Sequence, residues 1–229
     1  MKREVITTAD GSSTIFLPEL NECYHSTHGA INEAMHIFID AGFRVMMNQK
    51  SKLHILEIGF GTGLNALLTL LESIAANQAI FYHGIEPFPV DKCELDQINY
   101  PEQLDSTAAK TLFEKLHTSP WETKQAILPT FELLKTKQRI EELHLSTDFF
   151  DIVYFDAFAP TVQPELWQQE IFQKIFASMK EGGILVTYSC KGDVKRAMKA
   201  CGFTIEKLPG PIGKREFLRA TKNSTQNIE

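Results

Sequence analysis

Three glycines follow a short apolar segment, in the stretch Glu57-Ile58-Gly59-Phe60-Gly61-Thr62-Gly63. Glycine has no Cβ, so Gly59, Gly61 and Gly63 let the chain turn sharply and bring its backbone close to a ligand. Residues 53–58 have the pattern of a buried strand, and residues 64–76 carry apolar side chains at helical spacing. The loop between them therefore predicts a site for a nucleotide-type ligand, with a purely structural turn as the alternative.

An acidic residue follows the next predicted strand. Glu86 comes directly after residues 80–85, 27 residues beyond Gly59, where a carboxylate can accept hydrogen bonds from both hydroxyls of a ribose. Phe60 and Phe88 are candidates for the wall of a nucleoside pocket. The alternatives are a solvent-exposed loop acid at Glu86 and ordinary core packing for the two phenylalanines.

A second acid, Asp156, ends the most apolar predicted strand, residues 151–156. Ligands of open α/β sheets bind at the carboxyl ends of the strands. A fixed carboxylate there can accept a hydrogen bond from an amine, orient its lone pair and offset the positive charge that develops as the amine attacks an electrophile. Phe158 and Pro160 follow in the same loop and are candidates for substrate contact. A helix cap or a loop acid is the alternative for Asp156.

Charge is unevenly distributed along the chain. The net charge is −6, which by itself argues against a nucleic-acid ligand. Residues 191–222 nevertheless carry nine basic and three acidic side chains, whereas the 190 residues before them carry 14 basic and 25 acidic ones. Lys195, Arg196, Lys214 and Arg215 are candidates for phosphate contacts, although charge alone favours an ordinary solvated surface. The seven histidines show no H-x-x-x-H spacing, so no metal site is predicted.

The elements that must position these residues alternate between strands and helices. Further strands are predicted over residues 131–135, 184–188, 203–208 and 215–220, and further helices over residues 30–41, 164–179 and 193–201. Gly42 is predicted to cap the first of these helices, and Gly182 and Gly183 to end the second. Alternating elements imply a mostly parallel sheet covered on both faces. Since only a short loop separates the last two strands, the last one is predicted to be antiparallel.

The fold class is therefore α/β, with a Rossmann-like sheet of seven strands. Residues 1–45 are predicted to form an N-terminal hairpin and a helix packed on the core, residues 46–222 the main domain, and residues 223–229 a flexible tail. Residues 87–125 contain four prolines and predict a helical insertion. The chain has no apolar run long enough for a membrane span, no signal-peptide pattern and no CxxC pair among its four cysteines, so a cytoplasmic protein is expected.

Three blocks of the sequence resemble one particular family, the methyltransferase domain of the bacterial tRNA 5-methylaminomethyl-2-thiouridine synthesis enzyme. The first block is residues 56–65, the second is residues 156–160 with residues 164–167, and the third is Lys214-Arg215-Glu216 after a glycine-rich loop. Gly29-Ala30 and Glu33-Ala34 also match the family pattern upstream. The resemblance covers roughly residues 20–222, and it is specific because the three blocks occur in order and at suitable spacing.

The resemblance implies a Rossmann-like class I methyltransferase. Such an enzyme transfers a methyl group from S-adenosylmethionine to the 5-aminomethyl group of the tRNA wobble uridine, which gives 5-methylaminomethyl-(2-thio)uridine. By the same resemblance, Asp156 faces the substrate amine. The cofactor contacts that it implies are Glu57, Gly59, Gly61, Gly63, Asn65 and Glu86, with Phe88 beside them.

The family also has a bifunctional form with a fused FAD-dependent oxidase domain. Because the chain ends at Glu229, the stand-alone form is expected, with a separate enzyme as the candidate source of the aminomethyl precursor. Relatives of this fold often carry an acid near the adenine after the third strand. Residues 131–139 have no acid at the strand's end, so the residues that contact adenine stay unassigned.

Two other functions remain open from the sequence. A small-amine transferase of the polyamine-synthase type would use the same sheet, ribose acid and aspartate, although a basic rim disfavours a polycationic substrate. A nucleotide- or RNA-binding module without catalysis is the other, but it would not need Glu86 and Asp156 together. Salt-sensitive binding of tRNA would favour the methyltransferase over the small-amine transferase.

Overall fold

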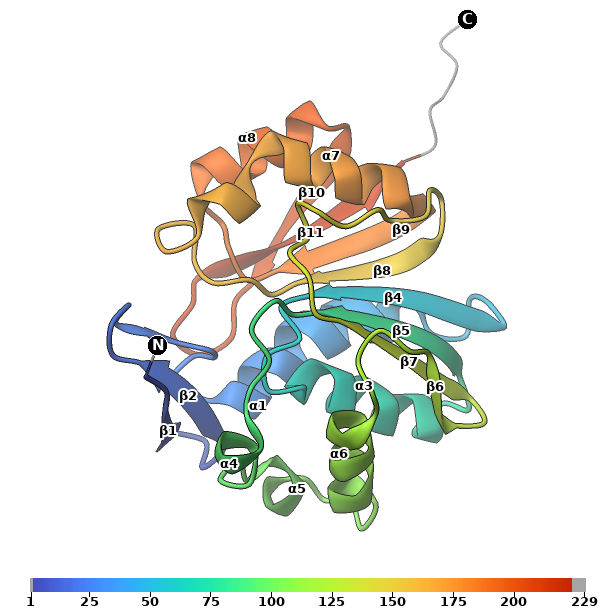
Figure 1. Ribbon diagram of the computed structural model, residues 1–229. Helices are drawn as coiled ribbons and strands as arrows, with labels where there is room; N and C mark the ends of the chain where they lie inside the picture. Colours follow the sequence, from blue (N-terminus) through green and yellow to red (C-terminus); the bar gives the residue numbers. More distant parts are fainter. Residues whose placement is uncertain (1, 224–229) are drawn as a thin grey trace, which may run out of the picture.

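The computed structural model describes residues 2–223, and its centre is a mixed eight-stranded sheet (Figure 1). The spatial order is β10-β11-β9-β8-β4-β5-β7-β6. Neighbours from β9 to β7 pair in parallel, whereas β11 is antiparallel to both of its neighbours and β6 is antiparallel to β7. The strands are β4 (Lys52–Ile58), β5 (Ala79–Ile85), β6 (Gln125–Leu128), β7 (Phe131–Thr136), β8 (Phe150–Phe155), β9 (Met179–Thr187), β10 (Phe203–Pro209) and β11 (Glu216–Lys222).

The predicted Rossmann-like α/β fold and the antiparallel last strand are confirmed, but the sheet has one strand more than predicted. The additional strand, β6, lies at the edge of the sheet. It has four residues, of which only Ile127 is buried. So short a segment, with a single buried residue, carries too little alternation to be recognised in sequence. A tight turn joins it to β7.

Helices cover both faces of this sheet (Figure 1). One face packs against α3 (Leu64–Ala75) and a helical N-terminal segment made of α1 (Ala30–Ala34), the π-helix η1 (Met35–Phe43) and α2 (Arg44–Met46). The other face packs against α7 (Gln169–Ser178) and α8 (Gly192–Ala200). The two faces have separate apolar clusters, as expected for a sheet buried on both sides.

Gly42 does not cap a helix, contrary to the prediction. Helical structure continues past it to Met46. A Cβ at this position would lie 3.1 Å from the Tyr154 ring and 3.2 Å from a methyl carbon of Val186. The glycine therefore lets η1 pack closely on the sheet, and the sequence signal that suggested a cap reflects packing.

The prediction of one helix over residues 164–179 was also wrong in detail. A 3-10 turn, Pro164–Trp167, comes first, and α7 begins after an extended residue, Gln168. The helix ends at Ser178, and β9 already includes Gly182 and Gly183. The pairing register of β8 and β9 shifts here, so these glycines accommodate an irregular strand and do not end the helix.

The strand β8 begins with a buried ion pair far from its carboxyl end. Asp151 is fully buried. Its carboxylate accepts hydrogen bonds from Lys50 at 2.6 Å, Lys180 at 2.8 Å and the backbone amide of His54 at 2.8 Å. Burial opposes ionisation of Asp151, but the two lysines and the amide hold its pKa below the usual value.

The N-terminal hairpin and the insertion lie together beside the carboxyl edge of the sheet (Figure 1). The hairpin consists of β1 (Glu4–Thr7) and β2 (Ser13–Leu17), with a short third strand, β3 (Glu22–Cys23). The helices between β5 and β6 are α4 (Lys92–Leu95), α5 (Tyr100–Gln103) and α6 (Ala109–Thr118). Asn99 joins the two regions, because its side chain accepts from the amide and hydroxyl of Ser13, both at 2.7 Å, and donates to the Gly11 carbonyl at 2.9 Å.

Within residues 2–223, no helix combines the length and the apolar character that crossing a membrane would require. Most of the tail predicted at residues 223–229 lies outside the described residues.

Candidate active site

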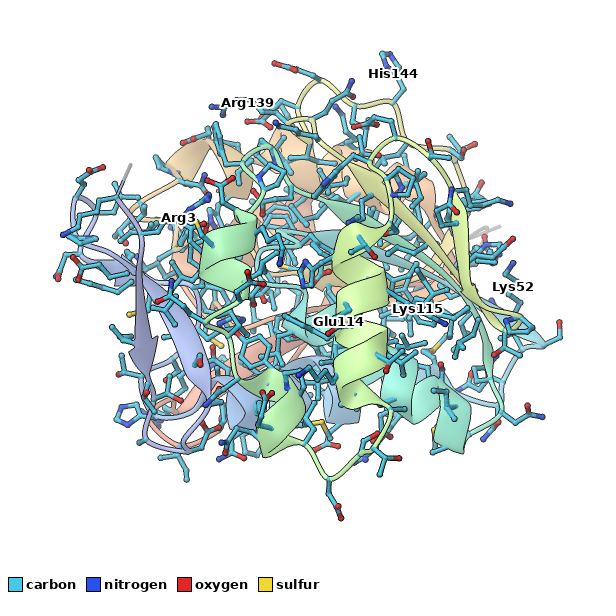
Figure 2. The ribbon with its side chains drawn as sticks, turned by 60° about the horizontal axis from the view of Figure 1, so that its bottom comes forward. Arg3, Lys52, Glu114, Lys115, Arg139 and His144 are labelled. Carbon is cyan, nitrogen blue, oxygen red and sulfur yellow. The ribbon has the colours of Figure 1, made fainter. Side chains whose placement is uncertain are left out.

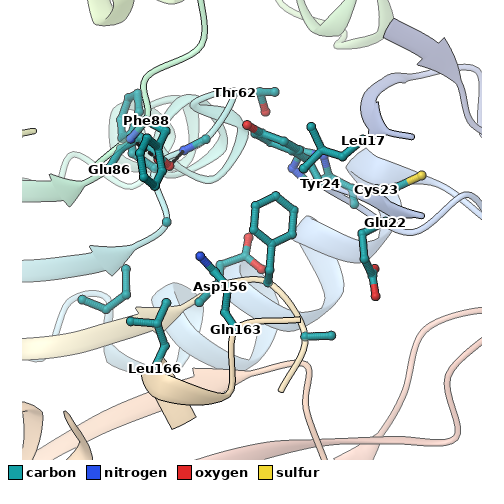
Figure 3. Close-up of a pocket in the computed structure, with 18 of the residues that line it drawn as sticks. Leu17, Glu22, Cys23, Tyr24, Thr62, Glu86, Phe88, Asp156, Gln163 and Leu166 are labelled. Atoms are coloured by element: carbon teal, nitrogen blue, oxygen red, sulfur yellow. Dashed lines mark hydrogen bonds between the residues drawn. The ribbon is translucent and has the colours of Figure 1, made fainter. Parts of the chain in front are cut away.

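A cavity of about 890 Å³ opens at the carboxyl ends of β4, β5 and β8. The N-terminal sheet forms one of its walls (Figure 3). Parallel strands bring their carboxyl ends to one edge, which is why residues distant in sequence meet here. The predicted site residues that line the cavity are Gly59, Phe60, Gly61, Asn65, Glu86, Phe88, Asp156, Phe158 and Lys214.

The glycine loop follows β4 in left-handed backbone conformations. Gly59 has φ of 90°, and a Cβ there would collide with the carbonyl oxygen of Asp156. Gly63 has φ of 72° and occupies the N-cap of α3, but it does not line the cavity. Glycine at these positions therefore permits the close passage of the loop past β8 and its turn into α3.

The insertion supports this loop from behind. The hydroxyls of Thr62 and Tyr100 are 3.0 Å apart, and His117 Nε2 lies 3.1 Å from the Thr62 carbonyl oxygen. Burial lowers the pKa of His117 to about 4, so the ring is neutral and Nε2 carries the donated hydrogen. His117 belongs to α6, and the exposed residues Glu114 and Lys115 lie on the outer side of this helix (Figure 2).

A buried lysine fixes the end of α6 to the sheet. Lys135 on β7 is 1% exposed, and its ammonium donates to the carbonyl oxygens of Leu116 at 2.8 Å and His117 at 3.1 Å. Burial lowers the pKa of Lys135 to about 8. The cation also lies 4.8 Å from the centre of the Trp121 ring. Lys135 thereby holds the helix that contacts Thr62.

Glu86 faces the cavity with both oxygens bonded to backbone amides. Oε2 accepts from Gly61 at 3.0 Å and Oε1 from Phe88 at 2.9 Å. Burial raises the pKa of Glu86, and these two hydrogen bonds oppose the shift. Each oxygen keeps a lone pair for a further donor, which is what a ribose diol requires.

The segment after Glu86 is held at the mouth of the cavity. Arg3, labelled in Figure 2, donates to the carbonyl oxygens of Phe88 at 2.7 Å and Pro89 at 3.1 Å. It also forms an ion pair with Glu94. The guanidinium of Arg139 lies 5.5 Å from the centre of the Phe88 ring. Both arginines line the cavity, so the N-terminal strand helps to position its rim.

Asn65 connects two carboxylates under the glycine loop. Its Nδ2 donates to Glu57 Oε1 and to Asp156 Oδ2, both at 2.9 Å. Its Oδ1 is buried and has no hydrogen-bond partner among residues 2–223. Burial raises the pKa of Asp156 to about 7; the nearby Glu33 adds to the shift, whereas the Asn65 hydrogen bond and Lys214 oppose it. A carboxyl group that titrates near neutrality is suited to exchanging a proton with an amine.

Glu57 does not line the cavity, although it was predicted to contact the cofactor. Its side chain is 1% exposed and accepts from Asn65 and from the Tyr82 hydroxyl at 2.8 Å. Burial is the main reason that its pKa is raised well above the usual value. Glu57 thus acts on the site through Asn65.

The far end of the cavity holds a pair of oppositely charged side chains. The Lys214 ammonium lies 2.6 Å from Glu33 Oε2 and 4.2 Å above the centre of the Tyr188 ring. Glu33 comes from α1 and is 7% exposed. The sequence offered a signal for it, since Glu33 is an acid on the predicted helix over residues 30–41 and belongs to the family pattern.

Another acid missed by the sequence reasoning is Glu141. It lies five residues after β7 and lines the cavity. Its Oε2 is buried and has no hydrogen-bond partner in the described part of the chain. Lys174 on α7 fixes this segment by donating to the carbonyl oxygens of Ile140, Glu141 and Leu143 at 2.6–3.1 Å.

Other predicted residues lie outside the cavity lining. Lys195 and Arg196 line a separate depression of about 480 Å³ over α8 and β10, and Arg196 forms an ion pair with Asp193. Pro160 and Arg215 line neither hollow. The structure therefore gathers Asp156 and most of the predicted cofactor residues, but neither Glu57 and Gly63 nor all of the predicted tRNA contacts.

Comparison with known proteins gives this geometry a family context. Residues 108–223 match the family described as S-adenosyl-L-methionine-dependent methyltransferase. Two curated relatives carry the name tRNA 5-methylaminomethyl-2-thiouridine biosynthesis bifunctional protein MnmC. The Magnetococcus marinus protein is 31% identical over 93% of this chain and 34% of its own length. The Paraburkholderia xenovorans protein is 31% identical over 90% of this chain and 33% of its own length. The chain thus spans about a third of these relatives.

Solved structures agree on the fold. MnmC2 from Aquifex aeolicus superposes with a TM-score of 0.80 at 24% identity, covering 97% of this chain and 71% of that one. Spermidine synthase from Thermotoga maritima superposes with a TM-score of 0.55 at 14% identity, covering 93% of this chain and 69% of that one. The resemblance predicted from the three sequence blocks is confirmed by the curated relatives. Since the family match extends over half of its residues, the chain belongs to the S-adenosyl-L-methionine-dependent methyltransferase family.

Proposed function

We propose that this enzyme methylates the 5-aminomethyl group of the tRNA wobble uridine and so forms 5-methylaminomethyl-(2-thio)uridine. The observation that carries the proposal is the partly buried Asp156 carboxyl, whose pKa of about 7 suits an amine substrate, at the cavity edge next to the glycine loop. The names of the curated relatives point to the same modification. We place the reaction in the cytoplasm, with a separate enzyme supplying the aminomethyl precursor.

The cofactor would lie between the glycine loop and Glu86. The free lone pairs of Glu86 would accept from the ribose hydroxyls. Asn65 Oδ1, which has no hydrogen-bond partner in the described part of the chain, would accept from the amino group of the methionine part. Gly59 and Gly61 allow the close approach of the loop backbone, and Phe88 lies at the rim. When bound, S-adenosylmethionine supplies an electrophilic methyl group on its sulfonium.

Glu141 is the acid that fits the adenine end. Its buried Oε2 lacks a hydrogen-bond partner among residues 2–223 and borders the cavity. An exocyclic amino group donates hydrogen bonds, so adenine would satisfy this oxygen, which is costly to leave unpaired. Lys174 keeps the segment in place through three carbonyl contacts.

Asp156 would act on the acceptor amine. A free alkylamine has a pKa of about 10 and is protonated at neutral pH, yet only the neutral amine has a lone pair for attack. Asp156 would accept a proton from the ammonium and then a hydrogen bond from the remaining N–H. The side chain of Asn65 fixes its orientation.

Contacts to the tRNA would surround this end of the cavity. Phe158 lines the cavity and packs edge-on against Tyr24, with ring centres 5.2 Å apart. Lys214 lies deeper, beside Glu33. The tRNA contacts that we propose are Phe158, Pro160, Lys195, Arg196, Lys214 and Arg215, of which the basic residues would meet phosphates.

The proposal is tested with S-adenosylmethionine labelled in its methyl group. The purified protein is incubated with tRNA that carries 5-aminomethyluridine, the tRNA is digested, and the nucleosides are separated. Label in 5-methylaminomethyluridine is expected, and matched tRNA with unmodified uridine should stay unlabelled. Absence of label from the aminomethylated tRNA would overturn the proposal. A parallel reaction with putrescine and decarboxylated S-adenosylmethionine tests the small-amine transferase.

A further inference from the structure

The far end of the cavity has the chemistry of a site for an organic ammonium ion. The Glu33 carboxylate and the Tyr188 ring face the same cation, at 2.6 Å and 4.2 Å. A carboxylate together with an aromatic face is the combination that binds ammonium groups. Asp156 borders the same cavity. In this structure the cation is the chain's own Lys214.

We propose that Glu33, the Tyr188 ring and Asp156 form the binding site for the protonated acceptor amine, and that the Lys214 ammonium fills this site until the substrate replaces it. This inference rests on the proposed function, since it assumes an amine substrate. In this proposal Glu33 binds the amine, and Asp156 accepts its proton.

Glu33 is built into the fold as a fixed carboxylate. It is 7% exposed, and its Oε1 accepts from the backbone amide of Ser26 at 3.2 Å. A buried carboxylate without a cation is costly, so the resting site holds an ammonium group. Tyr188 is also fixed, because its hydroxyl donates to the Ala157 carbonyl at 2.8 Å.

Lys214 is suited to leaving the site. It belongs to the loop between β10 and β11, and its side chain remains 27% exposed. Its ammonium reaches the site through a flexible four-carbon chain, so rotation of that chain can bring the charge to solvent or to a phosphate. The exchange keeps the charge of the site constant, since one ammonium replaces another next to Glu33.

Charge also explains why the exchange is required. If the substrate ammonium entered beside Lys214, two cations would share the Glu33 carboxylate and would repel each other at close range. With Lys214 displaced, Glu33 pairs with the substrate ammonium. The substrate then passes one proton to the Asp156 carboxylate and becomes the neutral amine.

Methylammonium chloride is the probe that tests the site independently of any nucleoside. Amide NMR shifts of Lys214→Met are followed during titration, with sodium chloride as the ionic-strength control. We expect Lys214→Met to bind methylammonium at least about tenfold more tightly than the unaltered protein, a factor that corresponds to about 1.4 kcal/mol. Adding Glu33→Gln, which keeps an acceptor for Ser26, should abolish this binding.

Lys222 offers a matched control. It has the same kind of environment outside the cavity, with Asp148 at 2.8 Å and the centre of the Phe176 ring at 5.0 Å. Lys222→Met should leave methylammonium binding unchanged. Equal binding by Lys214→Met and the unaltered protein, or tight binding that survives Glu33→Gln, would overturn the inference.

The tRNA assay separates this inference from the proposed function. If tRNA methylation fails but Lys214→Met binds methylammonium through Glu33, the ammonium site stands and the substrate assignment falls. If tRNA is methylated but methylammonium binding does not depend on Glu33, the function stands and the site falls. With both intact, Lys214→Met should also prefer 5-aminomethyluridine to 5-methyluridine more strongly than the unaltered protein does.

Discussion

The side-chain amide of Asn65 lies between two carboxylates and donates to both, to Glu57 on one side and to Asp156 on the other, at 2.9 Å each. The two acids differ in what they face. Glu57 is enclosed in the core with the Tyr82 hydroxyl, whereas Asp156 borders the cavity. Asn65 therefore anchors the Asp156 carboxylate, which we assign to the substrate, to a buried part of the core.

Replacement of Asp156 by asparagine should remove the proton acceptor without disturbing the cofactor end. Asparagine can still accept the hydrogen bond from Asn65, so the loop should keep its position. Single-turnover methylation should slow by about 10²–10⁴, the range for a general base. Calorimetry should find S-adenosylhomocysteine affinity within about threefold of the original. Normal turnover would remove Asp156 from the chemistry; Asp151→Asn, at the other end of β8, should turn over normally.

The pH dependence of the reaction should reflect the environment of Asp156. In the proposed reaction Asp156 acts as the carboxylate, so kcat/KM should rise as pH increases through about 7. Asn65 lowers the pKa of Asp156 by donating to it, and Asn65→Leu should therefore move this midpoint to higher pH. Rate profiles between pH 5 and 9 measure both midpoints. A midpoint that stays in place in Asn65→Leu would separate Asn65 from the titration.

Asp156 should also destabilise the free enzyme near neutral pH. An aspartate side chain that is open to water has a pKa of 3.8, whereas burial in the fold raises the pKa of Asp156 to about 7. Between these values the folded state binds more protons than the unfolded state, so its free energy of unfolding falls as pH rises. Asp156→Asn escapes this loss. Thermal melts of this variant should show a free energy of unfolding that is higher by on the order of 2 kcal/mol at pH 8, and by less at pH 5. An equal gain at both pH values would contradict the titration.

The contact between Tyr100 and Thr62 should contribute to cofactor binding from outside the cavity. Tyr100→Phe removes one hydroxyl of the pair, which is worth about 0.5–1.5 kcal/mol. The dissociation constant for S-adenosylhomocysteine should rise about two- to tenfold. Tyr154 is the matched control, since its hydroxyl is 3.2 Å from that of Thr69 in the core. Tyr154→Phe should cost stability but not affinity; equal losses of affinity in both variants would refute a specific effect on the loop.

Glu141 should select the adenine amino group. Glu141→Ala should weaken binding of S-adenosylhomocysteine but not of S-inosylhomocysteine, whose base lacks that amino group. Loss of one buried hydrogen bond to a charged acceptor should raise the dissociation constant for S-adenosylhomocysteine about tenfold relative to that for S-inosylhomocysteine. Calorimetry with both ligands measures it. If Glu141→Ala weakened both ligands equally, Glu141 would have only a structural role.

The parts of the site that the sequence predicted are those that follow directly from strand ends. Gly59, Glu86 and Asp156 each come immediately after a recognisable strand, and parallel strands bring such positions together. Glu57 belongs to the same block, but it precedes the end of its strand by one residue. Alternation of side chains along a strand therefore turns it away from the ligand side and into the core.

The contacts that could not be predicted depend on segments brought together from far apart. Glu33 meets Lys214 across 181 positions of sequence, and no local pattern encodes such a pair. Glu141 lies five residues after β7, in a segment without regular secondary structure. No periodic pattern therefore indicates where its side chain points. Lys195 is the opposite case: its basic helix was predicted correctly from the sequence, but α8 packs at the β10 edge, so Lys195 lies outside the cavity lining.

Asn99 binds the hairpin, whose region lines the cavity, to the insertion, whose helices hold Thr62. The hairpin beside the cavity and the insertion that supports the glycine loop are therefore held together by direct contacts. A ligand that orders either part reduces the entropy that remains to be lost at the other. Cofactor and tRNA should consequently bind with positive cooperativity, and by thermodynamic reciprocity each should strengthen the other by the same factor.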